Sequence, residues 1–164
     1  MRHTKDPQID DQVRAFGEKM RAARAAAGLS QVALSEATKL DRAAISFLER
    51  AERCPDLSTL VRVGRALRVT PSELLKGVGE GTVRFDRPSH KGVPAEPAAR
   101  LGANLRAARL QAKLSQEALG YEAEVDRAAI SVYERGGRGP NLRTVLKLAR
   151  ALGMRPTALL DGVE

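Results

Sequence analysis

The 164-residue chain is poor in the residues that catalysis, metal binding and disulfide formation use. It has one cysteine, two histidines and no tryptophan, and aromatic residues make up only 3% of it. A single cysteine excludes an internal disulfide and is typical of a reducing compartment. His3 and His90 are isolated, and neither a metal-ligand cluster nor a glycine-rich phosphate loop is present. We therefore expect no catalytic residue, no metal and no cofactor.

Long apolar runs are also absent. No stretch approaches the ~20 apolar residues that a membrane-spanning helix needs. The first twelve residues are polar and charged, whereas a secretory signal needs an apolar core. We expect a cytoplasmic protein that makes no membrane contact, and the sequence indicates no small-molecule ligand.

The most informative feature present is an internal repeat. When the sequence is aligned with itself so that Phe16 falls on Leu101, residues 16–78 match 101–163 without a gap. The longest shared string runs from Asp41 to Ser46 and recurs from Asp126 to Ser131. A repeat of this length indicates two duplicated domains rather than short solenoid units. We place the domains at 13–78 and 98–163, after a polar tail at 1–12 and around a linker at 79–97.

Positive charge is concentrated in the two repeats. The first copy, 16–78, has eleven Lys and Arg against seven Asp and Glu, an excess of four. The second copy, 98–163, has eleven against six, an excess of five, and the whole chain carries +8. A basic domain favours a polyanionic partner. Because binders of single strands need aromatic stacking platforms, the scarcity of aromatic residues favours duplex DNA.

Each copy has the pattern of five short helices, and nothing in either copy alternates as a strand does. Ser30, Asp41 and Asp56 stand where helix N-caps are expected. Residues 70–73 have the form of a capping box, with proline at the first helical position. The second copy repeats the caps at Ser115, Asp126 and Asn141. The fold class is therefore all-α, with two tandem five-helix domains joined by a linker that contains glycine and proline. Thr82–Phe85 in the linker is a candidate extended piece.

Several short motifs resemble the lambda-repressor/Cro-like (XRE-type) helix-turn-helix family. They are Leu-Ser-Gln, Ile-Ser, Glu-Arg and a Pro-x-Leu-x-Thr helix start. They occur at 29–31, 45–46, 49–50 and 55–59, and again at 114–116, 130–131, 134–135 and 140–144. The resemblance covers about four-fifths of the chain. It implies a transcriptional regulator, cytoplasmic and nucleoid-associated, that binds an operator in double-stranded DNA.

In such a domain the third helix enters the major groove and its first residues face the bases. We expect these recognition helices at about 42–51 and 127–135. The second is stopped by the glycines of 136–139, whereas 51–54 offers no comparable stop. Arginine can form a bidentate pair with guanine, and small or apolar side chains can touch a thymine methyl. The predicted contacts are Gln31, Arg42, Ala43, Ser46, Phe47 and Arg53 in the first copy, and Gln116, Arg127, Ala128, Ser131, Val132 and Arg138 in the second.

For several of these residues, interpretations that involve no contact with a base remain open. Arg42 at a helix start can hold a phosphate only, and Phe47 can be buried or bind a protein. Arg53 can form a surface ion pair with Glu49, four residues earlier. The resemblance implies that Glu49 instead pairs with Arg24, and that Glu134 pairs with Arg109 in the second copy.

Two further questions remain open at this stage. We favour repression over activation. The alternative function is a protein-binding regulator (an antitoxin, anti-activator or adaptor) in which one or both copies bind a protein. The chain can form an intramolecular pseudo-dimer, or it can form a homodimer through the apolar fifth helices that end at Leu75 and Leu160.

Overall fold

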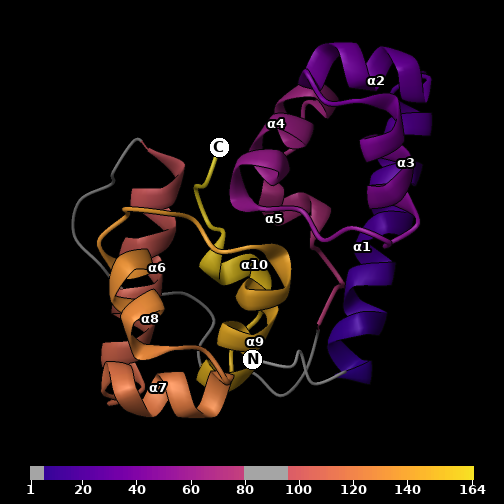
Figure 1. Ribbon diagram of the computed structural model, residues 1–164. Helices are drawn as coiled ribbons and strands as arrows, with labels where there is room; N and C mark the ends of the chain where they lie inside the picture. The colour runs from indigo at the N-terminus through magenta and orange to yellow at the C-terminus, as the bar shows by residue number, and fades with distance from the viewer. Residues whose placement is uncertain (1–5, 80–95) are drawn as a thin grey trace.

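The computed structural model describes residues 6–79 and 96–164, and these residues form two five-helix domains (Figure 1). The suggested extended piece at 82–85 lies outside the described residues. The helices of the first domain are α1 (Pro7–Ala26), α2 (Gln31–Thr38), α3 (Arg42–Glu49), α4 (Leu57–Leu67) and α5 (Pro71–Leu74). Those of the second are α6 (Pro97–Gln111), α7 (Gln116–Ala123), α8 (Arg127–Glu134), α9 (Leu142–Leu152) and α10 (Pro156–Leu159).

Most of the predicted caps are confirmed. Ser30, Asp56, Ser115 and Asn141 each accept a hydrogen bond from an early backbone N–H of the helix that follows. Thr70 and Glu73 form the reciprocal bonds of a capping box. Asp126 caps α8 by accepting from Ala128 N at 2.7 Å. Asp41 occupies the predicted N-cap position of α3, but its side chain makes no capping hydrogen bond.

The first helix begins earlier than the sequence pattern indicated. Asp6 accepts a hydrogen bond from Ile9 N, and Pro7 occupies the first helical position, where its missing N–H costs nothing. Residues 7–12, expected in a polar tail, are therefore helical. In the second domain Pro97, expected at the end of the linker, opens α6. The register of the repeat places Pro97 opposite Gln12, and positions 92–95, opposite the first four residues of α1, lie outside the described residues.

The recognition helix of the first copy does not run to residue 51. It ends at Glu49, and α8 ends at the equivalent Glu134, so both helices have eight residues. Ala51 adopts a left-handed conformation with φ of 58°, close to the 71° of its counterpart Gly136. The same turn therefore forms with alanine in the first copy and with glycine in the second. Lys39 and Glu124, after α2 and α7, are likewise left-handed.

The two domains pack on each other with a pseudo-two-fold relation. In Figure 1, α2 lies across the molecule from α7 and α3 from α8, while α5 and α10 meet near the centre. Equivalent positions touch each other: Asp56 and Asn141 form an antiparallel β-bridge, and Ser72 Oγ donates to Thr157 O at 3.2 Å. Contact between equivalent residues is the mark of an isologous interface. The chain is therefore a pseudo-dimer within itself.

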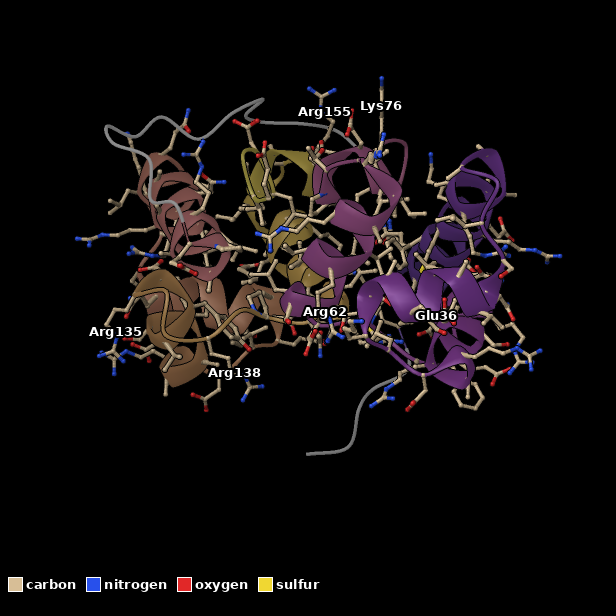
Figure 2. All side chains as sticks on the ribbon, turned by 90° about the horizontal axis from the view of Figure 1, so that it is seen from above. Glu36, Arg62, Lys76, Arg135, Arg138 and Arg155 are labelled. Carbon is tan, nitrogen blue, oxygen red and sulfur yellow. The ribbon has the colours of Figure 1, made fainter. Side chains whose placement is uncertain are left out.

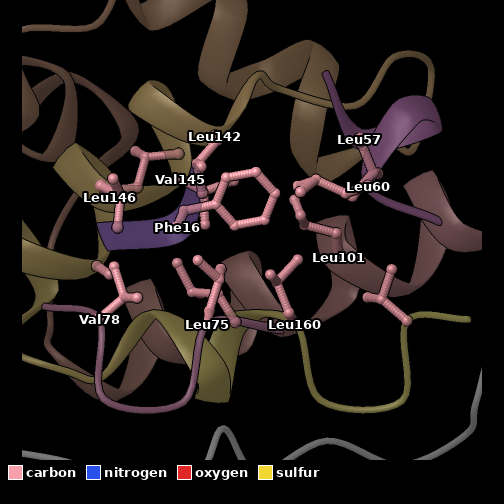
Figure 3. Close-up of a cluster of buried hydrophobic side chains, with 14 of the residues drawn as sticks. Phe16, Leu57, Leu60, Leu75, Val78, Leu101, Leu142, Val145, Leu146 and Leu160 are labelled. Atoms are coloured by element: carbon pink, nitrogen blue, oxygen red, sulfur yellow. The ribbon is translucent and has the colours of Figure 1, made fainter. Parts of the chain in front are cut away.

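The hydrophobic core is continuous across the two domains. Figure 3 shows Phe16 beside Leu142 and Val145 of the other copy, with Leu75 near Leu160. Leu75 and Leu160 have no exposed surface. The apolar fifth helices that the sequence offered for a homodimer are thus already paired inside one chain. None of the helices in the described ranges has the length and apolar character needed to span a bilayer.

Candidate nucleic-acid interface

Each recognition helix has one buried side and one side open to solvent. Ile45 of α3 and Ile130 of α8 have no exposed surface, and they anchor the helices to their domains. The predicted contacts occupy the opposite side. Arg42, Ala43, Arg53, Arg127, Ala128 and Arg138 are exposed, and Ser46, Ser131 and Val132 are half-buried. Because each isoleucine faces the core, the first turn of each helix is open to solvent, as entry into a major groove requires.

Phe47 is the one exposed aromatic residue among the predicted contacts. Its side chain is 39% exposed, and the Arg50 guanidinium lies 5.4 Å from the ring centroid. Arg50 also pairs with Glu52 at 2.8 Å. In the second copy Val132 takes the place of Phe47, and the counterpart of Arg50, Arg135, donates to Ser131 O. The exposed sides of α3 and α8, which we call the reading surfaces, therefore differ in shape and in the partner of the neighbouring arginine.

A buried ion pair ties each first helix to its recognition helix. Arg24 Nε donates to Glu49 Oε1 at 2.5 Å, and Arg109 Nε donates to Glu134 Oε1 at 2.6 Å. Both arginines also donate to the backbone carbonyl that follows the helix, at Leu29 and Leu114. The ion pairs implied by the family resemblance are confirmed. Glu49 points inward in this arrangement, so the alternative surface bridge from Glu49 to Arg53 is wrong.

Gln31 and Gln116 belong to the same networks, which sequence reasoning missed. Gln31 Nε2 donates to Glu49 Oε2 at 2.9 Å, and Gln116 Nε2 donates to Glu134 Oε2 at 2.8 Å. Burial raises the pKa of the Glu49 carboxyl, but the hydrogen bonds from Arg24 and Gln31 outweigh it and hold that pKa below its ordinary value. The glutamate stays charged and fixes the start of α2 against the end of α3.

A further support of the first domain also escaped the sequence analysis. Arg62 of α4 donates to the carbonyls of Thr38 and Lys39 at the end of α2, with Arg62 Nη2 at 2.7 Å from Lys39 O. In the second domain the end of α7 is held to α9 by a 2.8 Å ion pair between Lys147 and Glu124. A basic residue in the middle of α4 and α9 was visible in both copies. Its target was not, because 23 residues separate it from the turn.

Basic groups of both domains lie on one side of the molecule, where Glu36 of α2 also lies. Figure 2 shows Arg135 and Arg138, which follow α8, on the same side as Arg62 of the first domain. Lys76 and Arg155 point from the opposite side. In two-fold helix-turn-helix proteins a pair of exposed recognition helices faces two successive major grooves of a duplex.

Comparison with known proteins finds the same organisation. The helix-turn-helix family model matches twice, at residues 20–74 and 105–159. Residues of this chain are 41% identical over 61 positions to the control protein C.BamHI of Bacillus amyloliquefaciens, a match that covers 37% of this chain and 75% of that protein. The solved structure of the restriction-modification controller protein C.AhdI from Aeromonas hydrophila is 38% identical, with a TM-score of 0.37, and the match covers 39% of this chain and 96% of that one. The chain belongs to the XRE-type helix-turn-helix family and is a DNA-binding transcriptional regulator with two tandem copies of the domain.

Proposed function

We propose that one chain recognises one operator made of two related but non-identical half-sites, and that it acts as a repressor. The observation that carries this proposal is the pseudo-two-fold pairing of the domains, with both recognition helices exposed. In two-fold helix-turn-helix proteins the spacing of the readers matches half-sites about 34 Å apart. A single chain that already holds two readers in this way supports recognition of an inverted repeat without a second subunit.

The half-sites follow from the side chains of the two reading surfaces. Arg42 and Arg127 start the helices at equivalent positions, each followed by an exposed alanine. Shared residues support shared bases in the two half-sites. Phe47 and Val132 differ in size, so the base pair beneath them is where we expect the half-sites to diverge. Arg53 and Arg138, and the helix starts at Gln31 and Gln116, are suited to phosphate contacts.

Repression needs less of the protein than activation does. A protein bound across a promoter blocks it by occupancy alone, whereas activation requires an additional productive contact with the polymerase. The relatives are named as a control protein and a controller protein, names that fit either outcome. Transcription from a promoter that carries the selected operator, with and without the protein, distinguishes the two directly.

The first experiment is selection of bound sequences from random duplex DNA, followed by an affinity series. We expect an imperfect inverted repeat and binding that weakens steeply with salt, because phosphate contacts release counterions. Arg42→Ala/Arg127→Ala should weaken operator binding by ~1–3 kcal/mol for each arginine that reads a base. The matched control is Lys76→Ala/Arg155→Ala, which removes the same charge from the opposite side of the molecule.

Three outcomes would change the proposal. Full operator affinity in Arg42→Ala/Arg127→Ala would show that the recognition helices are assigned wrongly. An equal loss on all sequences, operator or not, would reduce the two arginines to phosphate contacts. Failure to bind any duplex, together with capture of another regulator through the exposed Phe47 surface, would favour the protein-binding alternative.

A further inference from the structure

The start of α1, the five residues 7–11, contacts the other domain. We call residues 6–11, which comprise these five and the capping Asp6, the strap. Asp10 Oδ1 lies 2.6 Å from Arg143 Nη2, and Asp6 Oδ2 lies 2.7 Å from Arg150 Nη2. Ile9, between the two acids, has no exposed surface. Both arginines belong to α9, so every one of these ion pairs crosses between the copies.

The rest of α1 is fastened to the first recognition helix. Arg24 near its end is bonded to Glu49 of α3. At Gly17 the helices are so close that an added Cβ would lie 2.7 Å from Glu49 O. A helix of twenty residues is a rod about 30 Å long. The helix α1 therefore connects the first recognition helix, α3, to α9, and α9 packs on α7 of the second domain.

The counterparts of residues 6–10, positions 91–95, lie outside the described residues, so the two copies are compared here at α4 and α9. The register places Ser58 of α4 opposite Arg143, and a serine hydroxyl cannot form the ion pair. Arg65, opposite Arg150, donates instead to Glu164 O at 2.9 Å. In the described part of the chain, α4 therefore shows no match for the two ion pairs that α9 forms with the strap. The strap adds these ion pairs to the shared core and to the bridge between Asp56 and Asn141.

We propose that the strap sets the spacing and orientation of the two readers, so that Asp6, Ile9 and Asp10 determine which half-site spacing the chain accepts. This inference rests on the proposed function. Two readers held rigidly gain their joint affinity only on DNA that presents both half-sites in the matching geometry. An inserted pair of base pairs turns one half-site by about 70° around the duplex axis, because a turn takes about 10 base pairs. A loose connection would follow that turn, and a rigid one would not.

The test compares the native chain with Asp6→Asn/Ile9→Ala/Asp10→Asn on operators that differ only in half-site spacing. Asparagine at position 6 still caps the helix, so the charge is removed without removing the cap. We expect the native chain to lose ~10–100-fold in affinity on an insertion of two base pairs, and the triple variant to lose only ~3-fold. Affinity for a single half-site should be equal for both, since no strap residue lies on a reading surface.

Matched variants separate this role from simple stability. Asp11→Asn removes a charge from the same helix, but Asp11 pairs with Arg14 inside α1, so the spacing profile should be unchanged. Arg143→Asp should relax the spacing preference, and Asp10→Arg/Arg143→Asp should restore it by reversing the ion pair. A triple variant that is folded by circular dichroism yet keeps the native spacing profile would overturn the proposal.

A measurement without DNA keeps the two proposals distinguishable. Spin labels at Arg50→Cys and Arg135→Cys, in a Cys54→Ser background, report the distance between the turns after α3 and α8. We expect a narrow distance distribution in the native chain and a broad one in the triple variant. An equally narrow distribution in both would overturn the role of the strap. Failure of every form to bind DNA would overturn the proposed function while leaving this result standing.

Discussion

The residues that position each recognition helix are the same in both copies. Arginine, glutamate and glutamine form one network at Arg24, Glu49 and Gln31, and the same network recurs 85 residues later with nearly equal distances. A charge buried this deeply is tolerated only because it is paired and hydrogen-bonded. The network lies behind the predicted DNA contacts, and it ties each recognition helix to the first helix and to the start of the second helix of its domain.

The Glu49 network should make stability depend on pH. Because the pKa of Glu49 is lowered by folding, its contribution is full above the unfolded value of ~4.3 and is lost as pH falls through the folded value. Glu49→Gln should lower the free energy of unfolding at pH 7 by about 2 kcal/mol. This is less than the ~3–5 kcal/mol of a fully buried pair, since solvent reaches the edge of Arg24. Urea titrations of both proteins between pH 7 and pH 3 should converge; a difference that stays constant would contradict this.

Among individual residues, the roles that depend on neighbouring positions in the chain could be predicted from the sequence. The caps at Ser30 and Asp56 follow from residue type and spacing, and so do the buried isoleucines of the reading helices. The hydrogen bond from Arg62 to the end of α2 could not be predicted from the sequence, because the two groups meet only when α4 packs on α2. For Asp41, residue type and spacing predict the N-cap position, yet the carboxylate accepts no hydrogen bond from α3.

At the scale of the elements, close approach of helices decides where each reader sits. In the second domain α6 crosses α8 at Gly102, where an added Cβ would press on Tyr133 O and lie 3.0 Å from Glu134 O. Gly17 occupies the equivalent position against α3. Backbone atoms cannot move aside as a side chain can. The two glycines are therefore what allows the first helix of each domain to lie directly on its recognition helix.

Gly102→Ala should lower the free energy of unfolding by about 1–3 kcal/mol through overpacking. Alanine would otherwise stabilise a helix interior by about 1 kcal/mol over glycine, so a net loss identifies the clash. Gly137→Ala is the control, since its nearest neighbour outside the turn is Val132 Cγ1 at 3.6 Å, an ordinary contact. Thermal and urea unfolding of the two variants should differ in sign or size; equal effects would show that the α6–α8 crossing is not as tight as described.

The order and type of the helices could be predicted from the sequence, while their ends could not in every case. A capped amphipathic repeat indicates ten helices in two sets, as found in the described residues. The end of α3 was misplaced because Ala51 takes a left-handed conformation that residue type disfavours. The start of α1 was misplaced because the polarity of Asp6 and Asp10 suggested solvent, whereas both acids meet arginines of the other copy.

At the scale of the whole molecule, duplication has placed two reading domains in one chain with a shared core. Phe16, Leu75 and Leu160 are buried where the copies meet. The sequence left the choice between a pseudo-dimer and a homodimer open, because an apolar fifth helix suits either. The structure joins the domains through these helices, through the bridge at Asp56 and Asn141, and through the strap.

The central claim is that one chain supplies both readers to one operator. The most direct test is the stoichiometry of the complex, measured by native mass spectrometry or sedimentation velocity on a duplex with a single selected inverted repeat. The account predicts one chain per duplex at saturation, with the free protein a monomer at the same concentration. A saturated complex of two chains per duplex, with no stable complex of one, would contradict it.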